Sequence, residues 1–272
     1  MKISIITVVL NDLTGLKKTV NSVLSQQGVD FEYVILDGGS SDGTWEYIES
    51  LKIKGITKQA SDTGIYNAMN NAVKLASGIF CLFLNAGDTF VDDFVLLKAN
   101  EALGDSDLYV GHTVEIGERV IKGMAPNPLT MDYLIRNSIY HQSTFIRRSL
   151  LLEHPYNEKH KIVSDWEFFF ERWIAGCSYD YLDFFVSNYY LGGFSFVNQE
   201  LINIERRECL ERILPSRILD GTYKGSHDNV ISCEGYEQQK ISKVMLCSPI
   251  QRDLNLIRYG IKFLIKDIFK WK

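Results

Sequence analysis

Strand-like and helix-like segments alternate strictly through residues 3–84, and this alternation constrains the fold more than any other feature of the sequence. The run 3–10 is almost wholly apolar and rich in β-branched residues, as is typical of a strand buried on both faces of a parallel sheet. The expected strands are 3–10, 31–36, 56–59 and 79–84, and the expected helices are 14–27, 44–51 and 64–77. The resulting β-α-β-α-β-α-β order predicts a doubly wound α/β sheet.

Polar loops follow three of these strands, over residues 11–12, 37–43 and 85–88. Each loop lies at the carboxyl end of its strand, and ligands bind beyond those ends in doubly wound sheets. We therefore expect the three loops to converge on one crevice, which would be the functional site.

Beyond residue 100 the pattern is weaker, but single elements can still be assigned. We expect a hairpin of 107–114 and 118–122, helices over 131–137, 164–175 and 198–219, strands over 142–147 and 181–190, and a helical turn over 149–153. Residues 220–240 are polar and contain glycine, which is typical of a linker or a mobile loop. The sequence thus predicts a globular domain over 1–215, a linker or mobile segment over 216–250 and a C-terminal helix over 251–272.

Composition and motif content exclude several classes of protein. The chain has 272 residues, of which 46% are hydrophobic and 23% charged, so it is of the globular type. A net charge of −5 argues against nucleic acid as a partner. Five cysteines without a CxxC pair argue against a disulfide scaffold or a zinc knuckle and fit a reducing compartment. The sequence contains no signal-peptide pattern and no transmembrane-length apolar run, so we expect a cytoplasmic location.

Asp37 and Asp88 are the first candidates for a functional role, because each follows a strand that should be buried. A carboxylate in such a place is costly unless it is paired or binds a ligand, and it can accept from a nucleobase or hold a hard cation. The alternative for Asp37 is a structural turn, since Asp-Gly is a common turn pair. The neighbouring glycines form neither GxGxxG nor GxxxxGK[ST], which disfavours a dinucleotide enzyme or a P-loop NTPase.

Five sequence blocks, taken in order, resemble family 2 glycosyltransferases, and more narrowly the bacterial branch that builds surface polysaccharides and glycolipids. The blocks are IITVVLN ending at Asn11, DGGSSDGT from Asp37, DTGIYNAMN from Asp62, FLNAGD ending at Asp88 and SDWEF from Ser164. The resemblance covers about residues 1–205. It implies a GT-A fold, with a mixed doubly wound sheet flanked by helices and a C-terminal helical extension. It also implies a nucleoside diphosphate-sugar donor, usually UDP-linked, a Mn²⁺ or Mg²⁺ cofactor, inversion at the anomeric carbon, and a lipid-linked glycan or surface polysaccharide as acceptor.

The resemblance also assigns roles to individual residues. Those expected around the nucleotide-sugar are Thr7, Leu10, Asn11, Asp37, Gly38, Asp62, Gly64, Asn85, Ala86 and Gly87. Asp37 would accept from the base, Asp88 would touch the metal, and Asp165 would deprotonate the acceptor hydroxyl. His141 and Trp166 are candidates for contacts with a phosphate, the metal or the acceptor sugar. The alternative for Asp165 is a first-turn carboxylate favoured by the helix dipole, with Ser164 as its cap.

The sequence departs from the family pattern at the metal motif, where Asn85 and Gly87 leave Asp88 as the single carboxylate. Relatives also often carry Glu at the position of Ala60 and Asp at the position of Asn67. Two other functions therefore stay open. A nucleotidyltransferase would need a Gly- and Arg/Lys-rich loop after the first strand, which is missing here. A catalytically silent nucleotide- or glycan-binding module of the same fold is compatible with the reduced metal motif.

The C-terminal segment 251–272 has an amphipathic pattern with a basic stripe. Its basic positions at helical spacing are Arg258, Lys262, Lys266 and Lys270. Such a helix suits the surface of an anionic membrane, which predicts a peripheral location on the inner face of the cytoplasmic membrane. The alternative is a terminal helix docked on its own domain, with the lysines in solvent.

Overall fold

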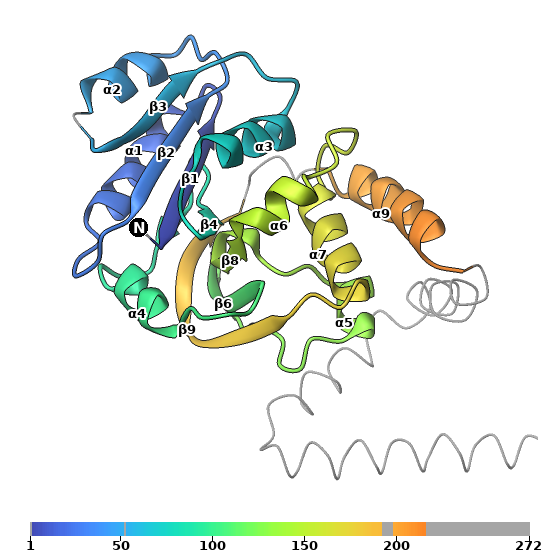
Figure 1. Ribbon diagram of the computed structural model, residues 1–272. Helices are drawn as coiled ribbons and strands as arrows, with labels where there is room; N and C mark the ends of the chain where they lie inside the picture. Colours follow the sequence, from blue (N-terminus) through green and yellow to red (C-terminus); the bar gives the residue numbers. More distant parts are fainter. Residues whose placement is uncertain (1, 52, 192–197, 216–272) are drawn as a thin grey trace, which may run out of the picture. The chain divides into compact units, whose positions relative to one another are not determined.

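The computed structural model describes residues 2–51, 53–191 and 198–215 (Figure 1). Its strands form one nine-stranded mixed sheet in the order β3-β2-β1-β4-β8-β6-β9-β5, with β7 paired to β6. Packing divides the chain into two compact units, Met1–Cys209 and Leu210–Lys272, and the sheet belongs to the first.

The N-terminal half has the predicted doubly wound order. Its elements are β1 (Ile3–Val9), α1 (Leu13–Leu24), β2 (Glu32–Asp37), α2 (Thr44–Ser50), β3 (Gly55–Gln59), α3 (Ile65–Leu75) and β4 (Phe80–Phe83). The β1 strand lies between β2 and β4, and β2 lies between β1 and β3, all in parallel pairing. Every residue of β1 and β2 is buried, as the apolar runs predict.

The two faces of this sheet are covered by different helices. On one face Ile3, Ile5 and Val9 of β1 belong to the same apolar core as Leu16 and Val20 of α1. The α3 helix also packs on β1 and β2 but lies outside that cluster, so it covers the opposite face. Full burial of each such aliphatic side chain stabilises the fold by about 1.5–3 kcal/mol, which makes the two-sided core the main source of stability.

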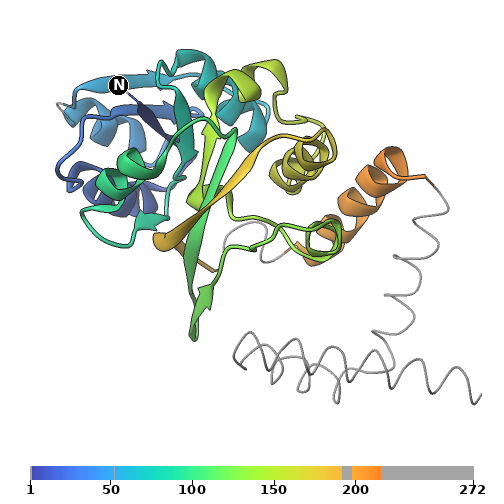
Figure 2. The ribbon, with the colours of Figure 1, turned by 60° about the horizontal axis from the view of Figure 1, so that its bottom comes forward.

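The second half adds antiparallel strands and further helices. Its elements are β5 (Thr89–Phe90), α4 (Val95–Ala102), β6 (Leu108–Ile116), β7 (Val120–Gly123), α5 (Met131–Arg136), η1 (His141–Ser143), β8 (Thr144–Arg147), α6 (Arg148–Glu153), α7 (Ser164–Ile174), β9 (Tyr179–Tyr190) and α9 (Gln199–Ile213). The β8 strand pairs antiparallel with both β4 and β6 and so joins the two halves of the sheet. The predicted hairpin is confirmed as β6–β7, which projects from the body of the sheet in Figure 2.

Three expectations for the second half need correction. The sequence analysis missed α4 and the two-residue strand β5. The strand expected over 142–147 begins only at Thr144, because residues 141–143 form a 3₁₀ turn. The helix α7 begins at Ser164 with Val163 as its N-cap, so Ser164 is not the cap, and its buried hydroxyl has no hydrogen-bond partner among the described residues.

Some predicted segments lie outside the described residues. They are the segment 216–250 and the basic C-terminal helix over 251–272. Within the part of the chain that the structure describes, no helix is long and apolar enough to cross a membrane.

Candidate active site

The carboxyl ends of β1, β2 and β3 bring three of the predicted nucleotide-binding residues together. A Cβ atom added at Gly38 would lie 2.5 Å from Asp62 Oδ2 and 3.4 Å from Leu10 Cδ1. A side chain at this position would displace the Asp62 carboxylate, so glycine lets the β2 loop and Asp62 lie this close together. Burial raises the pKa of Asp62, and the negative charge of Asp37 raises it further. Leu10 is 55% exposed, so it offers an apolar surface at the carboxyl end of β1.

Asn11 and the loop after β2 form a rigid polar rim. The backbone N–H of Asn11 donates to Ser40 Oγ at 2.7 Å, and Asn11 Oδ1 accepts from the Ser41 N–H at 2.8 Å. Asn11 itself has a left-handed φ of 51°, which asparagine tolerates better than most residues. The predicted convergence of loops 11–12 and 37–43 is thus present in the structure.

Asp37 is fully buried and is satisfied by its own surroundings. Its carboxylate accepts from the backbone N–H groups of Gly39 and Ser40, at 3.2 and 3.0 Å, and from Gln59 Nε2 at 2.7 Å. These contacts fit the structural-turn alternative, and a contact of Asp37 with a base stays a prediction.

Thr7 lies deeper than predicted. Its side chain is fully buried, and its hydroxyl donates to the Leu84 carbonyl at 2.7 Å and lies 3.1 Å from the Tyr33 hydroxyl. The structure therefore places the Thr7 side chain in the sheet beneath the crevice rather than on its surface. The cause is its mid-strand register, opposite Ile35 of β2.

The loop after β4 is held by Thr19, a residue of α1 that the sequence analysis did not single out. The Gly87 N–H donates to Thr19 Oγ1 at 3.0 Å, and the Thr19 hydroxyl donates to the Asp88 carbonyl at 2.7 Å. Gly87 has a φ of +102°, a backbone conformation that favours glycine. Together these features fix the direction of the Asp88 side chain.

Asp88 is a buried carboxylate. It is 8% exposed, and burial raises its pKa to about 7, although the nearby His141 and a backbone N–H of Tyr190 act in the opposite direction. The protein thus places too few donors or positive charges near Asp88 to offset its burial. Such a carboxylate is well suited to bind a cation, which would supply the missing positive charge.

A cavity of about 340 Å³ lies in front of this loop. The predicted residues that line it are Asn85, Ala86, Gly87, Asp88, His141, Asp165 and Trp166. It thus joins the loop after β4 to the start of α7, which are far apart in the sequence. The loops 11–12 and 37–43 and the residues Asp62 and Gly64 are not among its lining residues.

Asp165 is the centre of a hydrogen-bond network on the cavity wall. Its Oδ1 accepts from the Tyr66 hydroxyl at 2.9 Å, and its Oδ2 lies 2.9 Å from His141 Nδ1. Burial alone would raise the pKa of Asp165, but the hydrogen bond and charge of His141 and the bond from Tyr66 outweigh it and lower the pKa. The residue is therefore an ionised carboxylate at neutral pH.

Trp166 does not offer a face to a sugar. The side chain is 1% exposed, its indole N–H donates to the Leu134 carbonyl at 2.6 Å, and its ring stacks on Phe170. The Arg206 guanidinium lies 4.9 Å above the ring. The structure thus corrects the suggestion that Trp166 stacks on the acceptor: it packs in the core behind Asp165.

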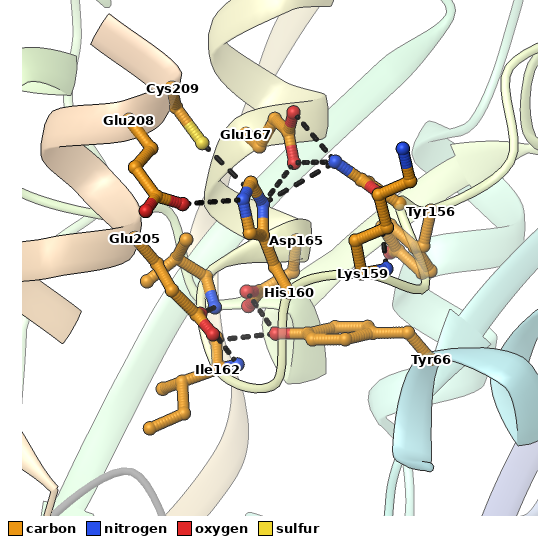
Figure 3. A network of polar contacts seen from close by, with 12 residues as sticks. Tyr66, Tyr156, Lys159, His160, Ile162, Asp165, Glu167, Glu205, Glu208 and Cys209 are labelled. Carbon is orange, nitrogen blue, oxygen red and sulfur yellow. Dashed lines mark hydrogen bonds and ion pairs between the residues drawn. The ribbon is translucent and has the colours of Figure 1, made fainter. Parts of the chain in front are cut away.

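The loop before α7 is fixed by Glu205 of α9, another residue that sequence reasoning missed (Figure 3). The buried Glu205 carboxylate accepts from the backbone N–H groups of Lys161, Ile162 and Val163 at 2.8, 3.0 and 3.2 Å. These donors lie in the segment that leads into the helix and end at its N-cap, Val163, so a distant glutamate holds the loop that positions the start of α7. The single Tyr66 hydroxyl hydrogen faces both the Ile162 carbonyl and Asp165 Oδ1, so this side chain connects the loop to Asp165.

His160, Glu167 and Cys209 form a second polar cluster beside this loop (Figure 3). Their ligand atoms all lie within 4.8 Å of one another, as a metal site would require. However, His160 Nδ1 lies only 2.7 Å from Glu167 Oε2, which is the separation of a direct hydrogen bond. The His160–Glu167 contact is therefore a hydrogen bond that ties the loop to α7.

The comparison with family models decides the classification. Residues 4–159 match the model of glycosyl transferase family 2, which is more than half of the chain. The chain belongs to this family. The matched region contains β1 to α6 and therefore the loops that carry Asn11, Asp37, Asp62 and Asp88.

Related proteins of this glycosyltransferase family come from several bacteria. A PGL/p-HBAD biosynthesis glycosyltransferase of Mycobacterium bovis is 33% identical over 174 residues, which cover 61% of this chain and 67% of the relative. The Escherichia coli enzyme WfaP, a UDP-Glc:α-D-GlcNAc-diphosphoundecaprenol β-1,3-glucosyltransferase, is 35% identical over 91 residues, 33% of this chain and 36% of its own length. The Staphylococcus aureus TarS structure in complex with UDP-GlcNAc matches with a TM-score of 0.62 and 21% identity, covering 81% of this chain and 70% of TarS. The chain is a glycosyltransferase, and the structural match confirms the GT-A fold.

The residues of this glycosyltransferase fit a divalent cation that binds through oxygen ligands. Asp88 supplies a buried carboxylate, and Asn85 Oδ1 is buried without a hydrogen-bond partner among the described residues. Both line the same cavity, and hard cations such as Mg²⁺ and Mn²⁺ prefer oxygen ligands. With one carboxylate, such a site would need substrate phosphates to complete the coordination of a bound cation.

Proposed function

We propose that this glycosyltransferase moves a sugar from a nucleoside diphosphate donor, UDP being the expected nucleotide, onto a lipid-linked glycan or a surface polysaccharide with inversion at the anomeric carbon. The observation that carries the proposal is the shared cavity, which has Asp88 on one wall and the ionised Asp165 on another. Direct displacement needs such an arrangement, with stabilisation of the leaving group on one side and a base on the other.

The two carboxylates have different tasks in this scheme. Asp88, with Asn85, would hold a Mn²⁺ or Mg²⁺ ion, which when bound neutralises the negative charge that develops on the departing diphosphate. Removal of the acceptor proton depends on Asp165. The crevice formed by Leu10, Asn11 and Asp62 would accept the nucleoside. The names of the relatives support the acceptor class, because WfaP acts on a diphosphoundecaprenol-linked sugar.

Nucleotide binding provides the first test. We expect one of UDP, GDP, dTDP or CDP, with UDP the expected one, to raise the melting temperature in the presence of Mn²⁺ or Mg²⁺ and much less without metal. A ligand at about 100-fold its Kd adds about 2.7 kcal/mol to the stability of the folded state. Thermal denaturation of the full chain with each nucleotide, with and without metal, measures this. Absence of any shift would contradict the donor site.

Membrane association through residues 251–272 belongs to the same proposal. The basic stripe at helical spacing should bring the enzyme to a lipid-linked acceptor, because each Lys or Arg near an anionic surface contributes about 1 kcal/mol. We expect the full chain to sediment with vesicles that contain anionic phospholipid and not with purely zwitterionic vesicles. Deletion of residues 251–272 should release it. Equal sedimentation of the truncated chain would refute the anchor, and K262Q/K266Q/K270Q is the matched variant that tests the charge alone.

A further inference from the structure

We infer that the proton of the acceptor hydroxyl is taken by His141 Nε2, with Asp165 holding the opposite ring nitrogen. The inference rests on the proposed transferase function and deepens it, because it names the atom that acts as base. It turns Asp165 into a positioning residue that fixes the tautomer and balances the charge of the histidine.

The hydrogen bonds around Asp165 determine the state of the histidine ring. Asp165 is ionised and has no proton to give, so His141 Nδ1, 2.9 Å from Oδ2, must be the donor in that contact. In a neutral imidazole with Nδ1–H, the lone pair is on Nε2. The other carboxylate oxygen already accepts from the Tyr66 hydroxyl. His141 Nδ1 and the shared Tyr66 hydroxyl thus face the two oxygens of Asp165, and in the neutral form of the ring Nε2 is a basic nitrogen with no protein donor among the described residues.

His141 Nε2 is buried and has no hydrogen-bond partner among the described residues. An unsatisfied buried acceptor is costly, typically about 1–3 kcal/mol, so its retention needs an explanation. The ring lines the cavity that also contains Asp88, so a hydroxyl bound in that cavity would supply the missing donor. The main-chain position is fixed as well, because His141 begins the η1 turn directly before β8.

The charged groups around the ring favour uptake of a proton during the reaction. Burial alone would lower the pKa of His141, but the hydrogen bond and charge of Asp165, together with the charge of Asp88, raise it. Lys161 and Arg206 are the cationic side chains that line the same cavity. An imidazolium formed beside the Asp165 carboxylate is stabilised, as in a histidine–aspartate pair of hydrolases, whereas the charge of Asp88 is offset once the proposed cation is bound.

The bond changes balance without any further reactant. The acceptor oxygen forms a bond to the anomeric carbon while its hydrogen moves to His141 Nε2. The bond between the anomeric carbon and the diphosphate oxygen breaks, and its electron pair leaves with the nucleoside diphosphate. The imidazolium then returns its proton to water, which restores the neutral ring for the next turnover.

Imidazole rescue separates a proton acceptor from a merely structural histidine. The reaction is release of UDP from UDP-glucose or UDP-GlcNAc by the full chain, with water as acceptor and with Mg²⁺, which prefers oxygen to imidazole ligands. We expect H141A to lose about 10²–10⁴-fold in kcat, to keep the UDP-induced thermal shift, and to regain turnover as imidazole is added. H141Q should show the same loss without rescue, because it can still donate to Asp165 but has no basic nitrogen. H154A is the control, because His154 is the partly exposed C-cap residue of α6. This variant should keep the wild-type kcat, and added imidazole should not change it.

The outcomes distinguish this inference from the proposed function. If wild type releases UDP and H141A does so at an unchanged rate, or loses its rate without imidazole rescue, His141 is not the base and the carboxylate of Asp165 acts directly. If wild type releases UDP from no donor and binds no nucleotide, the transferase function itself fails. Nitrogen-15 NMR of histidine-labelled full chain, with His141 assigned by its loss in H141Q, checks the tautomer: a hydrogen on Nε2 in the neutral ring would overturn the inference without any substrate.

Discussion

Replacing Asp165 with asparagine should reduce turnover by about 10³–10⁴-fold and leave nucleotide binding unchanged. The substitution keeps the size of the side chain but removes the negative charge that faces His141 Nδ1 at 2.9 Å and accepts from Tyr66 at 2.9 Å. The proposed nucleotide site lies at the ends of β1, β2 and β3 and does not include this carboxylate, so nucleotide binding should survive the substitution. The measurements are kcat for UDP release from the donor and the thermal shift produced by UDP.

The matched control is D132N. Asp132 is also an acidic residue in the first turn of a helix, but it is exposed on α5 and paired with Arg136. Loss of such a carboxylate costs at most about 1 kcal/mol and should not change turnover. If Asp165 were only a first-turn carboxylate that stabilises α7, D165N would behave like D132N. A D165N variant that keeps turnover within tenfold of the wild type would exclude this residue from the reaction.

The N-terminal half of the fold was predictable because its signals are local. Strands β1 and β2 are buried along their whole length, so an uninterrupted apolar run was the correct pattern to expect. The α1 and α3 helices have clear apolar faces at helical spacing. The second half was harder, because β5 has only two residues and β8 begins after a 3₁₀ turn. Such short elements form through pairing with distant strands and have too few residues to show a period.

The candidate carboxylates could be named from the sequence, but their hydrogen-bond partners could not. The position of Asp88 after a buried strand indicated a functional carboxylate from the sequence alone. Asp165 needed the family resemblance, since a helix start explains it equally well. Its contacts to Tyr66 and His141 join residues 99 and 24 positions away along the chain. Sequence separations of this kind are fixed by tertiary packing and have no local signal.

The supporting residues were missed for the same reason. Thr19 is an ordinary residue of an amphipathic helix until the loop after β4 folds onto it. Glu205 belongs to a helix whose polar residues look like a solvated face, yet its carboxylate is buried against three backbone N–H groups.

Replacing Asp88 with asparagine should abolish the metal dependence of UDP binding and at the same time stabilise the free protein above pH 7. Burial raises the pKa of Asp88 to about 7 in the folded state, whereas the unfolded residue titrates near its ordinary value. The folded state therefore binds the proton more tightly, and the wild type loses stability as pH rises from about 4 to 7. Asparagine stays neutral throughout, so its advantage grows across that window and is constant above it.

The expected size of this effect is measurable. A pKa raised from its ordinary value to about 7 lowers the free energy of unfolding of the wild type at high pH by at most about 4 kcal/mol relative to D88N. Each kcal/mol of stability raises Tm by about 2–4 °C in a domain of this size. The comparison is Tm of the wild type and D88N at pH 5 and pH 8, without ligand and with UDP plus Mn²⁺. D105N, at an exposed carboxylate between α4 and β6, is the control and should change neither quantity.

Two results would refute the role of Asp88. A D88N variant that keeps the metal-dependent UDP shift would show that the cation binds elsewhere. A variant less stable than the wild type at pH 8 would show that the carboxylate is compensated within the folded protein and is not a cost that ligand binding relieves. The expected pair of results, higher stability without ligand and no response to metal, would mean that the fold keeps a destabilising buried charge because the diphosphate and its cation require it.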